Sequence, residues 1–258
     1  MMKLVGALLV AGGLAAGLAS PAAAQSNLER IREAGAIRIG TEGTYAPFTF
    51  HDASGALVGF DVEIGREVAK RLGVEAQFQE GKWDGLIAGL DADRYDAVIN
   101  QVGITEERKQ KYDFSEPYIA SKAVLIVKSD NEEIKGFADL KGKRSAQSLT
   151  SNFGRIAEAN GAELVGTDGF DQSIQLVLQG RADATINDSL SFYDFQKAKP
   201  DAPVKIAAQE ENADYSGIII RKNEPDLLAA INKALEEIRA DGTYAKIADK
   251  YFGQDVSQ

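Results

Sequence analysis

The chain has 258 residues, of which 44% are hydrophobic and 26% are charged, and its formal net charge is −10 at pH 7. This composition is typical of a folded protein and argues against intrinsic disorder. An acidic chain is a poor partner for nucleic acid and for anionic lipid surfaces, so we expect it to bind neither.

The N-terminal segment has the pattern of a secretory signal peptide. A basic start at Lys3 precedes an apolar run over 4–19, and small residues at 22–24 form an A-x-A cleavage pattern before Gln25. A membrane anchor is the alternative, but the run is short for a bilayer span and rich in Gly and Ala. We therefore expect cleavage after residue 24 and no membrane insertion. Because the chain has no cysteine that could carry a lipid, we expect a free periplasmic protein.

Strand and helix patterns alternate along the remaining chain. The first series predicts strands at 36–40, 74–79 and 95–100 and helices at 60–72, 83–90 and 106–112. The second series predicts strands at 122–127, 144–147, 182–187 and 217–220, and helices at 137–140, 152–160, 171–179, 189–199, 227–240 and 244–251. Such alternation indicates an α/β protein whose sheets are covered by helices on both faces.

Two segments share one local design, in which a buried strand runs into polar residues and then into a helix. The segment YDAVINQVG leads to Arg108, and the segment ADATINDSL contains Asp188. Ligands of open α/β sheets gather at the carboxyl ends of strands. Arg108 offers a planar fork that matches a carboxylate, and Asp188 offers an anion for an ammonium group. The pair predicts a site for a zwitterion.

Simpler roles exist for both residues. Arg108 has three acidic neighbours with which it could pair, at Glu106, Glu107 and Glu116. Asp188 precedes a helix, and an N-cap is the commoner role for Asp at such a position.

The residues show no pattern for a metal, a cofactor or catalysis. His51 is the only histidine and lies in a turn, and the chain has no cysteine, so no metal-binding group is apparent. The chain also lacks a G-x-S-x-G motif, a P-loop and a dinucleotide fingerprint. We expect neither a cofactor nor enzymatic activity.

Several motifs, in order along the chain, resemble the polar amino-acid-binding proteins of bacterial ABC importers. They are TYAPF at 44–48, GFDVE at 59–63, GIT at 103–105 followed by Arg108, YDFSEPY at 112–118, DGTY at 241–244 and KYFG at 250–253. The resemblance implies the type II periplasmic-binding-protein fold, with two lobes that each contain a mostly parallel sheet with helices on both faces. Two hinge strands would join a first lobe at 25–120 plus 216–258 to a second at 121–215. It also implies a monomer that closes on an amino acid and docks on a membrane permease.

The resemblance also implies roles for individual residues. Arg108 would bind the ligand α-carboxylate, and Asp188 would bind its α-ammonium group. The aromatic walls would be Tyr45 and Trp83, and the backbone groups of Gln101 and Gly103 would contact the ligand. The loop at Thr150, Ser151 and Asn152, which opens a helix, would offer N–H and hydroxyl donors to the carboxylate.

Four further positions qualify this assignment. Gly103 stands where many relatives have Ser or Thr, and Thr150 stands where relatives usually have Gly. Glu42, beside the end of the first strand, would face either the ligand side chain or solvent. We expect Asp61 to be structural and to cap the helix at 60–72.

The segments WDGLIAGLDADRYDAVINQV, ITEERKQKYDFS and YFGQDVS look most like cystine-binding members. The only methionines are Met1 and Met2, so the chain after residue 24 contains no sulfur, which suits a scavenger of a sulfur source. A binder without thiols also cannot exchange with a disulfide ligand. A general binder of Gln, Arg or Glu is the alternative. An enzyme of another class, a periplasmic dehydratase or lyase on this fold, would need a general acid such as Glu42 or Asp188 in the cleft.

Overall fold

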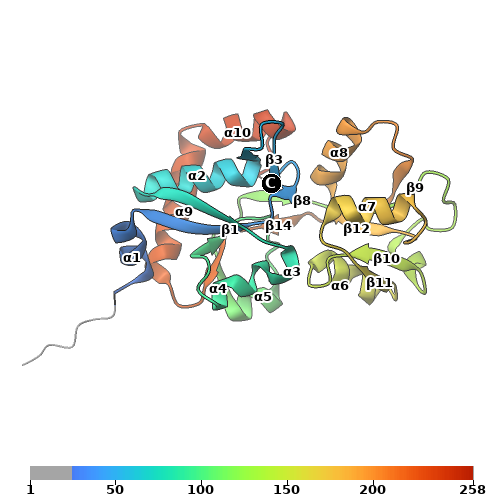
Figure 1. The fold of residues 1–258 in the computed structure, drawn as a ribbon, viewed down its shortest axis with the longest axis horizontal. Coiled ribbons are helices and arrows are strands. Elements are labelled where there is room, and N and C mark those ends of the chain that lie inside the picture. The colour runs from blue at the N-terminus through green and yellow to red at the C-terminus, as the bar shows by residue number, and fades with distance from the viewer. Residues whose placement is uncertain (1–24, 258) are drawn as a thin grey trace, which may run out of the picture.

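The computed structural model describes residues 25–257, which form two lobes side by side (Figure 1). The predicted signal peptide lies outside the described residues. Within the described part of the chain, no helix combines the length and apolar character that a bilayer span needs.

The first lobe is built on a five-stranded sheet with the order β5-β1-β6-β15-β7. Its strands are β1 (Ala36–Thr41), β5 (Glu75–Glu80), β6 (Ala97–Val98), β7 (Tyr112–Phe114) and β15 (Ile219–Arg221). Strand β1 pairs in parallel with β5 and β6, whereas β15 is antiparallel to β6 and β7. The carboxyl ends of β1 and β6 therefore lie together at one edge.

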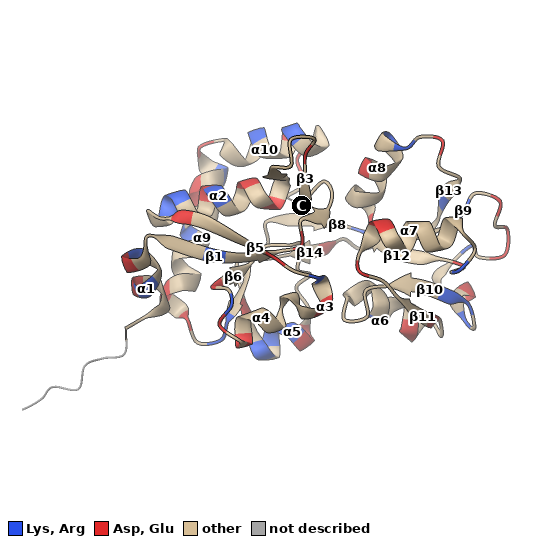
Figure 2. Ribbon diagram, viewed as in Figure 1, with Lys and Arg blue, Asp and Glu red and all other residues tan. Residues whose placement is uncertain are grey.

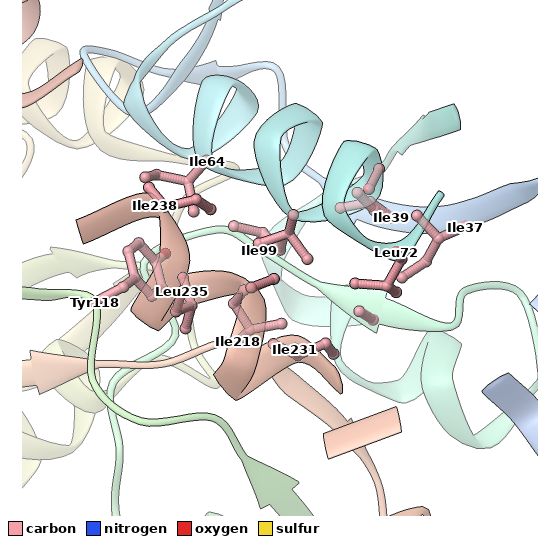
Figure 3. Packing of buried hydrophobic residues seen from close by; sticks show 14 of the residues in the cluster. Ile37, Ile39, Ile64, Leu72, Ile99, Tyr118, Ile218, Ile231, Leu235 and Ile238 are labelled. Atoms are coloured by element: carbon pink, nitrogen blue, oxygen red, sulfur yellow. The ribbon is translucent and has the colours of Figure 1, made fainter. Parts of the chain in front are cut away.

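Helices cover both faces of this sheet (Figure 1). One group comprises α1 (Asn27–Ala34), α2 (Phe60–Leu72), α9 (Pro225–Ala240) and α10 (Thr243–Phe252), and the other comprises α3 (Trp83–Leu86), α4 (Ala88–Asp91) and α5 (Glu106–Lys111). Helix α2 buries Phe60, Ile64, Val68 and Leu72, which recur every four residues, and it ends at Gly73, whose φ of 79° is left-handed. Figure 3 shows the resulting core, in which isoleucines of the sheet pack against α2 and α9.

The second lobe has two groups of strands. In the first, β9 (Ala123–Lys128) lies between β12 (Thr185–Asp188) and β13 (Val204–Gln209) and is antiparallel to both. In the second, β10 (Arg144–Gln147) and β11 (Glu163–Gly166) are parallel, and a parallel bridge between Ser145 and Ala184 connects β10 to the β12 segment. The lobe's helices are the 3-10 helix η1 (Phe137–Leu140), α6 (Asn152–Ala159), α7 (Phe170–Leu178) and α8 (Ser189–Ala198).

Two short antiparallel strands, β8 (Ile119–Ser121) and β14 (Asp214–Ser216), connect the lobes. β8 leads into β9 of the second lobe, and β14 returns the chain toward β15 of the first. A small sheet of β2 (Thr44–Tyr45), β3 (Thr49–His51) and β4 (Leu57–Val58) lies beside the first lobe's helices.

The predicted two-lobed α/β fold is confirmed, with corrections of detail. The sheets are mixed and not mostly parallel. The strands β9 and β15, which follow the two connections between the lobes, are each antiparallel to both of their neighbours. The single helix predicted at 83–90 is two short helices, and the strand predicted at 95–100 has ladder pairing only at 97–98. The elements that the prediction lacked are α1 and the strands β2, β3, β4, β7, β8, β11, β13 and β14.

Candidate ligand-binding site

A pocket lies between the two lobes and encloses about 680 Å³, including space open to solvent. The first lobe contributes, among the predicted residues, Glu42, Tyr45, Trp83, Gln101 and Gly103. The second lobe contributes Ser151, Asn152 and Asp188. The fold thus gathers predicted residues from both lobes in one place.

Arg108 lies beside this pocket but is not one of its lining residues. Its Nη1 donates a hydrogen bond to the carbonyl of Gly103 at 2.9 Å, and its guanidinium carbon lies 5.3 Å from the centre of the Trp83 ring. Burial lowers the pKa of Arg108 to about 10, so the group remains cationic at neutral pH. Arg108 therefore contacts two residues of the pocket wall, Gly103 and Trp83.

The predicted alternative of an ion pair for Arg108 is not observed. Within residues 25–257, no carboxylate lies within 4.0 Å of Arg108, and Glu107 instead pairs with Arg155 of the second lobe at 2.8 Å. A Cβ atom at Gly103 would lie 3.5 Å from Nη1 of Arg108 and 3.6 Å from Nδ2 of Asn152. The absence of a side chain at Gly103 keeps the space between these donors open.

Asp188 is both a helix cap and a wall of the pocket. Its Oδ1 accepts a hydrogen bond from the backbone N–H of Leu190 at 2.8 Å, as expected for the N-cap of α8. Its Oδ2 accepts from the hydroxyl of Ser121 in the hinge strand β8. Burial raises the pKa of Asp188 to about 6, so the carboxyl is mostly ionised at pH 7. The two proposed roles of Asp188 are compatible.

Glu42 follows β1 directly and is 9% exposed. Its Oε2 accepts from the side-chain amide of Asn100 at 2.6 Å, and the carbonyl of that amide accepts from the Glu42 backbone N–H at 2.8 Å. Burial raises the pKa of Glu42 to about 7. Of the two predicted environments for Glu42, the structure supports the pocket and not the solvent.

The two predicted aromatic walls come from β2 and α3. The hydroxyl of Tyr45 donates to Oδ1 of Asn187 in the second lobe at 2.8 Å. Trp83 is 8% exposed, and its indole N–H has no hydrogen-bond partner among the described residues. Both aromatic side chains thus line the space between the lobes.

Thr150 lies on the predicted loop before α6, but its donors bond to the other lobe. Its backbone N–H and its hydroxyl both donate to Oδ1 of Asp84, in the first lobe, at 2.9 Å. Thr150 is not a lining residue of the pocket, and both of its donors are occupied by Asp84. Ser151 caps α6 by accepting from the N–H of Gly154 at 2.9 Å. The direct ligand contact assigned to Thr150 stays a prediction that this geometry does not favour.

Asp61 does not cap α2 as predicted. The N-cap is Gly59, and no side-chain hydrogen bond caps this helix. Asp61 is fully buried and accepts hydrogen bonds from the backbone and side-chain nitrogens of Gln101 at 2.7 and 2.8 Å. The hydroxyl of Tyr118 donates a further bond at 3.0 Å. Asp61 therefore connects the start of α2 to the tip of β6 beneath the pocket.

Sequence analysis did not identify several other polar residues that line the pocket. They include Ser121, Lys122, Asp214 and Ser216 at the hinge strands, and Ser148 and Ser173 in the second lobe. The available signal was that Lys122 begins the predicted strand at 122–127 and that Asp214 lies shortly before the predicted strand at 217–220. The pairing of β8 with β14, which brings both residues to the pocket, was not predicted.

Contacts between the lobes surround the pocket. Besides Thr150 and Asp84, the ion pairs Lys82–Asp168 and Glu107–Arg155 connect the lobes, at 2.7 and 2.8 Å. Charged residues of both signs are scattered over both lobes in Figure 2. The lobes are therefore in contact beside the pocket. This arrangement defines a class, that of two-lobed proteins that bind a small solute between hinged lobes.

The chain belongs to the bacterial extracellular solute-binding proteins, family 3, whose sequence profile matches residues 37–254. It is 46% identical over 229 residues to the L-cystine-binding protein TcyA of Bacillus subtilis, which covers 88% of this chain and 85% of the relative. The predicted resemblance to this family is therefore confirmed.

Two solved structures bear on the arrangement of the lobes. The L-cystine solute receptor of Neisseria gonorrhoeae, in its unliganded open conformation, is 48% identical and covers 90% of this chain and 98% of that chain, with a TM-score of 0.59. An ancestral arginine-binding protein bound to arginine is 40% identical, and the match covers 85% of this chain and 99% of that chain, with a TM-score of 0.80. The fold agrees better with the liganded protein although its sequence is less similar, which fits the contacts between the lobes described above.

Proposed function

We propose that this protein captures L-cystine outside the cytoplasmic membrane and delivers it to the permease of an ABC importer. The observation that carries the proposal is the pocket between the lobes, with Asp188 on one lobe and Arg108 beside it on the other. A zwitterion can be buried there at low energetic cost only because each of its charges has an opposite charge nearby. The cystine-binding names of the two relatives support the choice of ligand.

The proposed mechanism is capture by closure. The lobes move about β8 and β14, and the ligand favours the closed state because it contacts both lobes at once. The closed form then docks on the permease. The family supports a transport role, and the relatives reported above are binding proteins and not enzymes.

The finer assignments belong to the same proposal. The lobe limits at 25–120 plus 216–258 and at 121–215 are supported by the sheets, because β8 and β14 lie at those limits. We also propose that the signal peptide is cleaved after residue 24, that no lipid is attached and that the product is monomeric. Intact-mass measurement and light scattering on the periplasmic product test these points together.

A thermal-shift panel of all amino acids plus cystine tests the ligand, with calorimetry on every hit. We expect strong stabilisation by cystine, in proportion to its affinity. Stabilisation by Gln, Arg or Glu with none by cystine would contradict the proposal and favour a general polar amino-acid binder. Incubation with each hit and analysis for product tests the dehydratase alternative, for which we expect no turnover.

A further inference from the structure

One buried acceptor in the pocket lacks a partner. Gln101 lines the pocket and is 8% exposed, and its Oε1 accepts no hydrogen bond from residues 25–257. Proteins seldom leave a buried carbonyl unpaired, because such a group has lost its water without replacement. An unpaired acceptor in a ligand pocket indicates that the ligand supplies the donor.

The orientation of this amide is determined by Asp61. Oδ2 of Asp61 accepts a hydrogen bond from the backbone N–H of Gln101, and Oδ1 accepts one from its side-chain nitrogen. The ionised carboxylate of Asp61 can only accept, so the nitrogen of the Gln101 amide faces Asp61 and the oxygen faces away. The Tyr118 hydroxyl donates to the same Oδ1 and occupies the remaining side of Asp61.

The backbone of Gln101 is held in an uncommon conformation. Its φ is 51°, in the left-handed region that residues other than glycine seldom adopt. Such strain persists only where surrounding bonds maintain it, and it is concentrated at functional sites. Here the maintaining bonds are the two that Asp61 accepts from Gln101.

We infer that Oε1 of Gln101 accepts a hydrogen bond from a cationic nitrogen of the ligand, and that Asp61 is the positioning residue that turns it toward the ligand. The inference rests on the proposed function and extends it, because the family resemblance gives Gln101 backbone contacts alone. Glu42, which is also an acceptor, lies in the same pocket and in the same lobe. Two acceptors besides Asp188 suit a ligand with a second cationic group. In cystine this group is the second ammonium.

Asp61→Asn tests the positioning role. In this variant the Asn oxygen continues to accept from the backbone N–H of Gln101. The Asn nitrogen then takes the place of Oδ1, which accepted from the side-chain amide of Gln101. Gln101 must then turn its amide over, and it presents an N–H to the ligand instead of a carbonyl. Gln101→Met is the second variant, because it removes the acceptor without moving the Asp61 carboxylate and remains informative if Asp61→Asn folds poorly.

The ligands are cystine and the mixed disulfide of cysteine with 3-mercaptopropionate, which lacks only the second ammonium. Calorimetry gives the preference of each protein for cystine over this analogue. We expect both variants to reduce the preference by at least about tenfold, as for a hydrogen bond to a charged group. Loss of structural support alone would weaken both ligands equally and leave the preference unchanged.

Glu63→Gln is the matched control. Glu63 lies in the same first turn of α2, but it bonds to Lys250 and Tyr251, away from the pocket. An unchanged preference in both Asp61→Asn and Gln101→Met would overturn the inference while leaving the proposed function intact. If the wild type binds another amino acid and not cystine, the proposed function fails separately. The same variants then decide the inference, with that amino acid and its analogue lacking the side-chain nitrogen.

Discussion

Arg108 lies beside the pocket and contacts Gly103 and Trp83, two of the residues that line it. We predict that Arg108→Ala weakens cystine binding by more than about 3 kcal/mol, because a buried ligand carboxylate would lose its cation. Calorimetry measures the effect. Arg155→Ala is the control, since Arg155 is an exposed cation near the same edge of the cleft and should matter little. Equal affinities for wild type and Arg108→Ala would remove Arg108 from the site.

Three buried carboxyl groups around the pocket make its behaviour depend on pH. Burial raises the pKa of Asp188 to about 6 and the pKa values of Glu42 and Asp61 to about 7. Unfolded carboxyls titrate near pH 4, so between about pH 4 and 7 these groups bind more protons in the folded state. Their contribution to the stability of the empty protein therefore decreases as the pH rises through this window.

Ligand binding should have the opposite pH dependence. An ammonium group needs the ionised form of Asp188, so affinity should increase as the pH rises through about 6. We predict that the rise in melting temperature at saturating ligand grows between pH 5 and pH 8, as scanning calorimetry can measure. Asp188→Asn should bind weakly and lose most of this dependence. A ligand-induced shift that stays constant across the range would contradict the prediction.

At the scale of elements, helix α4 packs against the ring of Tyr95. A Cβ atom at Gly89 would lie 2.2 Å from Cε2 of this fully buried ring, and one at Gly40 of β1 would lie 2.8 Å from Cδ2. We predict that Gly89→Ala destabilises the protein by about 1–3 kcal/mol through overpacking. The measurement is urea unfolding followed by circular dichroism.

Gly85 provides the matched control for this substitution. It lies in the neighbouring helix α3, and its Cβ would meet no atom within 4 Å. Gly85→Ala should therefore be neutral or stabilise by up to about 1 kcal/mol, from helix propensity alone. A similar loss of stability in both variants would show that the effect of Gly89→Ala comes from backbone freedom and not from the contact with Tyr95.

Elements with a strong period and clear ends were predictable from sequence. Helix α2 was predicted at its observed limits, because apolar residues recur on one face and Gly73 ends it. The strand predicted at 95–100 is assigned only at 97–98, although the backbone N–H groups of Asp96 and Ile99 also donate to β1, at Arg38 and Gly40. The short strands of the hinge carry too little local pattern to be recognised.

The same limit applies to the site. Arg108 and Asp188 were identified from charge at strand ends, and Asp188 indeed lines the pocket. Lys122 and Asp214 were missed because they enter the pocket only through the crossing of β8 and β14, distant segments that pair in space. The role of Asp61 was missed because its partner Gln101 lies on another element.

At the scale of the whole molecule, Asp84 holds the lobes together on one side of the pocket. Its carboxylate accepts two bonds from Thr150 at 2.9 Å, and the N–H of Leu149 lies 3.4 Å away. We predict that Asp84→Ala increases the rate of ligand dissociation by roughly three- to tenfold, because these bonds exist only when the lobes meet. Stopped-flow fluorescence of Trp83 follows the dissociation.

Asp168→Ala is the comparison for Asp84→Ala. Asp168 also contacts the other lobe, but its pair with Lys82 is exposed and should contribute little. X-ray scattering should show a more open unliganded ensemble for Asp84→Ala than for Asp168→Ala. If both variants release ligand at the wild-type rate, closure does not depend on these contacts.

The end of the chain is attached to the hinge. The carbonyl of Val256 accepts a hydrogen bond from the N–H of Ala120 in β8 at 2.8 Å, and Val256 is 3% exposed. Figure 1 marks this terminus beside β3 and β8. A fluorescent reporter fused after Ser257 would therefore be anchored to β8, one of the two strands about which we propose that the lobes move, and we expect its emission to respond to occupancy. The fold thus provides an attachment point for a sensor of the bound ligand that leaves every pocket residue unaltered.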